Sequence, residues 1–379
     1  MSLHETYDEM IEILNSSKTT DEKKGYFLDK MRKEAERLLA SKSIVLCGAT
    51  PFAKHVFEHR EWLFHDDVDL VMEDFDEDTI AMPEAVYVLC SRPNISKHID
   101  DLHKKGIENI LPYQFLLLLE PRYDASPYAY TYDKMEKQIE DIIEHADEYQ
   151  HIYESLCDSK SKELLMKMIV YRLTYDYHMH ENNATQYPHY FDEDVFTLQD
   201  DEIIVDCGGY IGDTLEVVKN LTANSYKQYY LFEPDESLIS IAKKKGDERV
   251  VFINKGVWEN EEVLFFKQQT ANGNGAFVDE KADGGILEVP VTSLDLTVSE
   301  ATFIKMDVEG SELMALKGAQ KLIRKCHPKM AICVYHKYED YRELFSFIEP
   351  LGYKMFLRAE MNNIDTELYY LCIPETRED

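Results

Sequence analysis

One stretch, residues 203–214, constrains the fold of this chain more than any other: Ile-Ile-Val-Asp-Cys-Gly-Gly-Tyr-Ile-Gly-Asp-Thr. An apolar run ends at Asp206, a turn with three glycines follows, and a helical pattern begins near Asp213 and Thr214. A strand, a glycine loop and a helix in this order form a nucleotide-type pocket, because a ligand can approach backbone that carries no side chains. The spacing Asp-x-Gly-x-x-x-Gly differs from the Gly-x-Gly-x-x-Gly of dinucleotide sites, which favours S-adenosylmethionine over a pyrophosphate ligand.

The composition limits the partners and the compartment. The chain has 73 acidic and 41 basic side chains, and its formal net charge is -32. Such a chain repels phosphate backbones, and its densest basic run, residues 243–245, lies at a predicted helix end, so we expect no nucleic-acid partner. The seven scattered cysteines include no Cys-x-x-Cys pair, which favours a reducing cytoplasm over a disulfide framework. The sequence has neither a signal-peptide pattern nor an apolar run of the ~20 residues that a membrane helix needs, so we expect no membrane association.

The order of predicted elements divides the chain into three parts. Residues 1–120 are predicted to form helices followed by a small Rossmann-like α/β domain, residues 121–200 a helical connector, and residues 201–379 a second α/β domain. The first domain is predicted to have strands at 44–47, 68–72, 85–90 and 107–111 in a small parallel sheet. Its first loop has a single glycine, Gly48, before Pro51, so cofactor binding there is a weaker alternative to a scaffold, dimerisation or substrate-recognition role.

The connector and the last domain give more detailed predictions. We expect helices at 133–157 and 159–177, and the aromatic segment 185–196 forms either a cap over the pocket or an ordinary packed loop. In the last domain, strands at 203–206, 229–232, 250–253, 302–306 and 329–335 alternate with helices. Residues 263–267 and 287–291 resemble hairpin strands around the polar loop 272–275, and a helix is expected from 311 to 324.

The last two predicted strands, 352–358 and 367–373, leave no room for a helix between them, so they must be antiparallel. A mostly parallel sheet closed in this way is the class I methyltransferase architecture. We therefore expect an α/β protein with a Rossmann-like sheet of seven strands, the last antiparallel, preceded by a smaller α/β domain and a helical connector.

Ligands of doubly wound sheets bind at the carboxyl ends of the strands. The first strand supplies Asp206 and the glycine loop, and the second supplies Glu233, which can accept hydrogen bonds from both ribose hydroxyls. The third strand end is placed to flank the adenine, and the fourth supplies Asp307 and Glu309. Any one of these acids can equally cap its following helix, and only their combination is specific. The predicted cofactor-binding residues are Asp206, Gly208, Gly209, Tyr210, Gly212, Asp213, Thr214, Glu233, Pro234, Lys255, Gly256, Val257 and Asp307.

Several motifs resemble the FkbM-type methyltransferase family over residues of about 186–373. They are Asp206–Thr214, Phe232-Glu-Pro234, Val291-Thr-Ser-Leu-Asp295, Ile304-Lys-Met-Asp-Val-Glu-Gly-Ser-Glu312 and Leu316-Lys-Gly-Ala319. The resemblance implies an S-adenosylmethionine-dependent methyltransferase that acts on oxygen of a sugar or another small metabolite. The family commonly has Glu-x-His after the fifth strand. This chain has Val334-Tyr335-His336-Lys337, which keeps the histidine and lacks the carboxylate.

Methyl transfer from a sulfonium is an in-line displacement, so the protein mainly has to align the acceptor with the methyl group. A hydroxyl acceptor also benefits from a base. His336 is one candidate, although it can also be a surface histidine at a helix start, and Asp307 and Glu309 are the alternatives. No metal-ligand spacing is evident, so we predict chemistry without a metal.

The main hypothesis is thus O-methylation of a small hydroxylated metabolite by S-adenosylmethionine. Two alternatives are a nicotinamide-dependent oxidoreductase that uses the N-terminal domain and a non-catalytic S-adenosylmethionine-binding protein. The predicted partner is a small-molecule acceptor such as a sugar, and self-association as a homodimer stays open.

Overall fold

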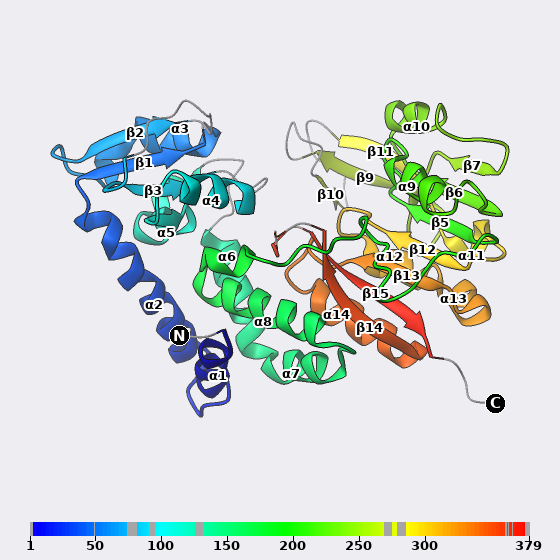
Figure 1. The fold of residues 1–379 in the computed structure, drawn as a ribbon, viewed down its shortest axis with the longest axis horizontal. Helices are drawn as coiled ribbons and strands as arrows, with labels where there is room; N and C mark the ends of the chain where they lie inside the picture. Colours follow the sequence, from blue (N-terminus) through cyan, green and yellow to red (C-terminus); the bar gives the residue numbers. More distant parts are fainter. Residues whose placement is uncertain are drawn as a thin grey trace. The chain divides into compact units, whose positions relative to one another are not determined.

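The computed structural model describes residues 3–48, 50–73, 82–90, 95–125, 132–268, 275–278, 286–360, 362, 364–365 and 367–375 (Figure 1). Its chain divides into two compact units. The first contains Met1–His151, Glu163–Asn183 and Asn362–Ile364, and the second contains Ile152–Lys162, Ala184–Met361 and Asp365–Asp379. Residues 121–200, predicted as a separate connector, thus contribute to both units. No helix among the described residues combines the length and apolar character that a membrane crossing requires.

The first unit contains the predicted small parallel sheet, with strand order β2-β1-β3-β4 (Figure 1). Its central strands are almost wholly buried apolar residues, as expected for parallel strands covered on both faces. The strands are β1 (Ser43–Cys47), β2 (Asp69–Glu73), β3 (Val86–Leu89) and β4 (Ile110–Pro112). The helices around them include α1 (Leu3–Leu14), α2 (Thr20–Ala40), α3 (Pro51–Glu58), α4 (Ile95–Lys104), α5 (Gln114–Leu119) and the 3-10 turns η1 (Arg60–Trp62) and η2 (Pro121–Ala125).

The helix predicted at 133–157 is two helices, so that prediction was wrong in one respect. The chain forms α6 (Tyr132–Glu144) and α7 (Ala146–Ser155), with His145 between them. The carbonyl of His145 accepts hydrogen bonds from the N–H groups of Glu148 and Tyr149, at 3.0 and 3.1 Å, and thereby starts a new helix. The second predicted helix, 159–177, forms as α8 (Ser159–Thr174) and ends three residues earlier than predicted, and the 3-10 turn η3 (Tyr177–His180) follows it.

The second unit contains a seven-stranded sheet of order β14-β15-β13-β12-β5-β6-β7 (Figure 1). β15 pairs antiparallel with both β13 and β14, and the other pairings are parallel, so the predicted Rossmann-like methyltransferase sheet with its antiparallel last strand is confirmed. The strands are β5 (Ile203–Cys207), β6 (Gln228–Phe232), β7 (Val250–Ile253), β12 (Phe303–Met306), β13 (Lys329–Cys333), β14 (Tyr353–Ala359) and β15 (Leu368–Pro374).

A smaller sheet of order β10-β9-β11-β8 belongs to the same unit. Its strands β9 (Glu262–Gln268) and β11 (Ile286–Thr292) pair antiparallel, which confirms the predicted hairpin. β8 (Gly256–Val257) extends the sheet at β11, and β10 (Gly275–Val278) extends it at β9. Gly275 was predicted to be in a loop and instead begins a strand, while Asn272–Asn274 lie outside the described residues.

The helix predicted from 311 to 324 is interrupted at Gly318. A Cβ atom at this position would lie 2.1 Å from the carbonyl oxygen of Trp258, so only glycine allows the close backbone contact. The break is stabilised by Asp295, whose N–H donates to the Gly318 carbonyl at 2.9 Å and whose carboxylate accepts from Leu322 N–H at 2.8 Å. The helices of this unit include α9 (Asp213–Leu221), α10 (Glu236–Ala242), α11 (Leu294–Thr297), α12 (Glu312–Lys317), α13 (Gln320–Cys326), α14 (Asp340–Ile348) and the 3-10 turn η4 (Glu349–Leu351).

Candidate functional site

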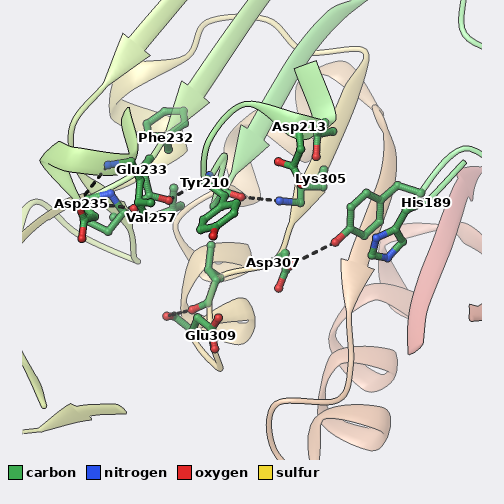
Figure 2. Close-up of a pocket in the computed structure, with 18 of the residues that line it drawn as sticks. His189, Tyr210, Asp213, Phe232, Glu233, Asp235, Val257, Lys305, Asp307 and Glu309 are labelled. Carbon is green, nitrogen blue, oxygen red and sulfur yellow. Dashed lines mark hydrogen bonds between the residues drawn. The ribbon is translucent and has the colours of Figure 1, made fainter. Parts of the chain in front are cut away.

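A pocket of about 1020 Å³ lies in the second unit at the carboxyl ends of β5, β6 and β12. In the view of Figure 2, Glu233 and Asp235 lie at one end, His189 lies at the other, and Asp307 lies between them. This is the edge of a doubly wound sheet where ligands bind. The predicted site residues that line the pocket are Gly208, Tyr210, Asp213, Thr214, Glu233, Pro234, Gly256, Val257, Asp307 and Glu309.

The other predicted site residues do not line this pocket. They are Asp206, Gly209, Gly212, Lys255 and His336. Lys255 lies at a different surface depression, where its ammonium is 2.5 Å from the carboxylate of Glu261. The roles of the remaining four follow from their contacts.

The glycine loop needs its glycines for several different reasons. Gly208 has a positive φ of 81°, and a Cβ atom there would lie 1.9 Å from the carbonyl oxygen of Asp307. A Cβ atom on Gly209 would lie 2.3 Å from Leu231, and Gly212 begins α9 at a positive φ of 76°. The loop therefore packs tightly against β6 and β12, and the pocket gains its backbone surface at Gly208.

Asp206 and Lys305 form a buried ion pair beneath the loop. They are register partners on the parallel strands β5 and β12, and 3.2 Å separates Asp206 Oδ1 from Lys305 Nζ. Lys305 also donates to the Gly208 carbonyl at 2.6 Å, and Tyr229 donates to Asp206 Oδ2 at 2.7 Å. Burial by itself lowers the pKa of Lys305, but the carboxylates of Asp206 and Asp307 outweigh burial and raise that pKa, so the ammonium is retained.

Glu233 is held at the pocket wall by backbone donors. Its carboxylate accepts from the N–H of Asp235 at 2.8 Å and from the N–H of Tyr210 at 3.1 Å. Glu233 is only 7% exposed, and burial raises its pKa to about 7 although these two hydrogen bonds act in the opposite direction. A carboxylate that is fixed in this way can accept hydrogen bonds from the two adjacent hydroxyls of a ribose.

Asp307 lies at the end of β12 among three donors. Tyr190 donates to its Oδ2 at 2.9 Å, Tyr335 donates to its Oδ1 at 3.5 Å, and His336 Nε2 is 3.4 Å from Oδ1. Burial acts to raise the pKa of Asp307, but Lys305 and His336 outweigh it and hold that pKa below its usual value. The carboxylate is therefore anionic at neutral pH, and its side chain stays 26% exposed, so a ligand in the pocket can reach it.

His336 contacts Asp307 but does not itself line the pocket. Its Nδ1 is 2.9 Å from Glu312 Oε1, and its Nε2 is 3.8 Å from Glu309 Oε2. Burial lowers the pKa of His336, but the carboxylates of Glu312, Asp307 and Glu309 outweigh it and raise that pKa to about 10. The ring is thus an imidazolium at neutral pH and has no free lone pair to accept a proton, which favours Asp307 or Glu309 as the base.

Glu309 lies on the tight turn after β12, at a positive φ of 55°. Its side chain is 52% exposed and lines the pocket. It can therefore contact a ligand, but the structure gives it fewer fixed donors than Asp307 has. Two residues later, Ser311 directly precedes α12, and its hydroxyl donates to the Val308 carbonyl at 2.7 Å instead of capping that helix.

Several pocket residues were missed by sequence reasoning. Lys305 had a signal, because it is a lysine within an otherwise apolar buried strand. The segment 185–196 was predicted either as a cap or as a packed loop. Pro188, His189 and Tyr190 line the pocket, while Phe191 stacks on Phe303 in the core, so both interpretations hold for different residues. Further pocket residues that were missed include Tyr335, Glu360 and Glu367.

Comparison with solved structures gives a match that extends over nearly the whole chain. A crystal structure of methyltransferase FkbM from Methylobacillus flagellatus KT is 19% identical, with a TM-score of 0.67, and the match covers 98% of this chain and 99% of that chain. Aeropyrum pernix fibrillarin, solved with natively bound S-adenosyl-L-methionine, is 10% identical over 46% of this chain and 69% of its own, with a TM-score of 0.31. Precorrin-6y C5,15-methyltransferase from Geobacter metallireducens GS-15 is 11% identical over 47% of this chain and 82% of its own, with a TM-score of 0.30. No protein of curated function matches the sequence.

The family comparison is specific to the second unit. Residues 206–355 match the family described as Methyltransferase FkbM domain. This range begins at Asp206, contains Glu233 and Asp307, and ends within β14. The resemblance that the sequence motifs predict is therefore confirmed for residues 206–355, which match the FkbM methyltransferase domain.

Proposed function

We propose that this protein transfers the methyl group of S-adenosylmethionine to a hydroxyl oxygen of a sugar or another small hydroxylated metabolite. The observation that carries the proposal is Glu233, a buried carboxylate fixed by two backbone N–H groups in the same pocket as the glycine loop and Asp307. This arrangement fits an adenosine ribose, and the methyltransferase domain makes the methyl donor the matching ligand.

Each part of the donor has a candidate partner. The ribose hydroxyls donate to Glu233, and Val257 and Leu238 offer apolar surface for the adenine. The methionine end lies towards Gly208, Asp213 and Thr214 in this proposal, because the glycine loop exposes backbone there. The sulfonium is cationic, and the acidic pocket lining favours a positively charged ligand.

The acceptor is proposed to bind beside Asp307, along the pocket wall that includes His189, Tyr190 and Tyr335. Asp307 is the candidate partner for the reacting hydroxyl, since it is anionic and fixed by Tyr190 while one side of it faces the pocket. A hydroxyl oxygen becomes strongly acidic as it gains the methyl group, so a carboxylate of low pKa suffices to take its proton late in the reaction. Most of the rate then comes from alignment of acceptor and methyl group.

The first experiment tests which cofactor binds. Calorimetry of the full chain with S-adenosylmethionine, S-adenosylhomocysteine and NAD is expected to show binding of the first two. Binding of NAD without S-adenosylmethionine would favour a nicotinamide-dependent oxidoreductase and refute the proposal.

A second experiment separates an enzyme from a non-catalytic binding protein. Donor labelled in its methyl group is incubated with a panel of hydroxylated sugars and related metabolites, and the product is analysed by NMR. We expect label in an O-methyl group. Label on nitrogen or carbon would contradict O-methylation, and donor binding without transfer to any panel member would favour a non-catalytic role.

A further inference from the structure

We propose that His189, Glu360 and Glu367 form a binding site for one divalent metal cation at the acceptor end of the pocket. One potential ligand atom of each residue lies within 4.8 Å of the other two. All three side chains line the pocket that contains Asp307. The spacing in the sequence gave no sign of this group, because His189 is far along the chain from the other two residues.

The backbone holds the two glutamates in fixed positions. Glu360 directly follows β14, and Glu367 directly precedes β15, its antiparallel neighbour. Their main chains are linked, since the N–H of Glu360 donates to the carbonyl of Glu367 at 3.1 Å. The two carboxylates thus extend from the same end of one hairpin, and a cation between them would offset their mutual repulsion.

Packing fixes the imidazole of His189 on the other side. A turn closed by the hydrogen bond from Phe191 N–H to the Pro188 carbonyl, at 3.0 Å, contains this histidine. Its ring stacks on Tyr190 with 3.6 Å between centroids and lies 5.1 Å from the ring of Tyr369. His189 Nδ1 faces Glu360 Oε2 at 2.9 Å. This ring needs little reorientation to place a nitrogen beside the two carboxylates.

The one ligand–ligand distance that is fixed by an ion pair suits a metal polyhedron. Two ligand atoms bonded to a cation at about 2.1 Å and at right angles are about 3 Å apart, which is close to the separation of His189 Nδ1 and Glu360 Oε2. One imidazole with two carboxylates suits Mn²⁺, Fe²⁺ or Zn²⁺. Three protein ligands leave coordination positions that face the pocket, where hydroxyl oxygens of an acceptor can bind.

A second group of Asp307, Glu312 and His336 also brings its ligand atoms within 4.8 Å. It is a poorer candidate, because Glu312 is fully buried and its Oε1 already accepts from the N–H of Val308 at 2.9 Å. His336 there also lies within 3.8 Å of three carboxylates, whose negative charges favour its protonated form over a metal ligand.

The test measures cation binding by the full chain without methyl donor or acceptor. Mn²⁺ is titrated and free Mn²⁺ is followed by electron paramagnetic resonance, with calorimetry as the second readout. We expect one saturable Mn²⁺ per chain. His189→Ala and Glu367→Gln should each weaken binding by at least about tenfold. The matched control is His178→Ala, because His178 Nδ1 faces Glu181 Oε1 at 3.0 Å in an exposed pair outside the proposed site, and this variant should bind Mn²⁺ as the wild type does.

Absence of saturable Mn²⁺ binding by the wild type overturns the proposal. So does binding that His189→Ala and Glu367→Gln leave unchanged, which would indicate only diffuse attraction to an acidic surface. Circular dichroism checks that the variants fold. If they do not, anomalous diffraction from wild-type crystals soaked in Mn²⁺ decides: a peak between the three side chains supports the site, and a peak elsewhere or none refutes it. Donor binding is measured separately. Absence of the metal site would therefore leave the proposed methyl transfer intact, and absence of donor binding would leave the proposed metal site intact.

Discussion

The ammonium of Lys305 and the carboxylate of Asp206 face each other across β12 and β5, with 3.2 Å between Nζ and Oδ1 and both side chains almost completely buried. The pair also supports the floor of the pocket, because Lys305 donates to the carbonyl of Gly208. Two charges in this environment are favourable only together, since each compensates the loss of water around the other. The pair therefore links the stability of the sheet to the position of the glycine loop.

Removal of the lysine should destabilise the fold strongly. Lys305→Met leaves Asp206 as an uncompensated buried charge, so we expect a loss of about 3–5 kcal/mol in the free energy of unfolding, measured by chemical denaturation. Lys245→Met is the control, because its partner Glu216 lies 2.7 Å away in a pair that is partly exposed to water. That change should cost at most about 1 kcal/mol. Equal losses of unfolding free energy in the two variants would mean that the buried pair stabilises the fold no more than the exposed pair does.

Gly208 should not tolerate a side chain. Gly208→Ala adds a Cβ atom 1.9 Å from the Asp307 carbonyl oxygen at a positive φ, so we expect destabilisation of at least about 3 kcal/mol together with lost donor binding. Gly352→Ala measures the cost of the positive φ alone, because Gly352 has the same φ of 81° and nothing within 4 Å of the added Cβ atom. It should cost only about 1–2 kcal/mol in thermal or chemical unfolding. Similar losses in both variants would argue against the close contact at Gly208.

Glu233 should control donor affinity and its pH dependence. Glu233→Gln should weaken S-adenosylmethionine binding by roughly 1–3 kcal/mol in calorimetry, the range expected for lost hydrogen bonds to a charged group. The pKa of Glu233 in the free protein is raised from 4.5 to about 7, and the ribose hydroxyls need the ionised form. Wild-type affinity should therefore rise as the pH increases through about 7, and this rise should be absent in Glu233→Gln.

The same pKa shift has an opposite effect on stability. A carboxyl whose folded-state pKa lies above its unfolded-state value holds its proton more tightly when folded. Its contribution to the free energy of unfolding is thus largest below pH 4.5 and is lost as the pH rises through about 7.

The affinity measurement decides the role of Glu233 in donor binding. A wild-type donor affinity that is flat from pH 5.5 to 8 would contradict that role.

His336 should stabilise the protein as a cation. Its pKa is raised from 6.5 to about 10 in the folded protein, so its contribution is fully present below pH 6.5 and is lost as the pH rises through about 10. Urea unfolding of the wild type should show this decline between pH 6.5 and 10, and His336→Ala should be less stable at pH 6.5 with a weaker dependence on pH. If His336→Ala slowed turnover while stability and its pH profile stayed unchanged, a direct role as base would be favoured instead.

Asp307 should affect the chemical step. Asp307→Asn keeps the shape of the side chain but removes its charge, so we expect kcat to fall by about 100-fold or more. Donor affinity, measured by calorimetry, should stay near the wild-type value. Tyr190→Phe removes the hydrogen bond of 2.9 Å to Oδ2 and the contact of 3.6 Å with Cys333 Sγ but leaves the charge of Asp307 in place, so it should reduce kcat less. Unchanged turnover in Asp307→Asn would move the role of base to Glu309, and Glu309→Gln is the variant that tests it.

Local sequence patterns were sufficient for much of the fold. The apolar run before Asp206, the glycine loop and the alternation of strands and helices specify a doubly wound sheet, because these patterns act over short distances along the chain. The sequence leaves no room for a helix between the segments that form β14 and β15, which also determines their antiparallel pairing. Local patterns failed at His145 and at Gly318, where helices are divided by hydrogen bonds and packing that involve residues outside the periodic pattern.

The chemical roles of the site residues depended on the tertiary structure. The sequence by itself placed Glu233 and Asp307 at strand ends, and both line the pocket. It also grouped Asp206 and His336 with them, yet Asp206 is buried against Lys305, and three carboxylates surround His336 and keep it protonated. Strand order determines which side chains meet, and burial with neighbouring charge determines their protonation. Those factors arise only when segments far apart in the chain pack together, as His189 does with Glu360.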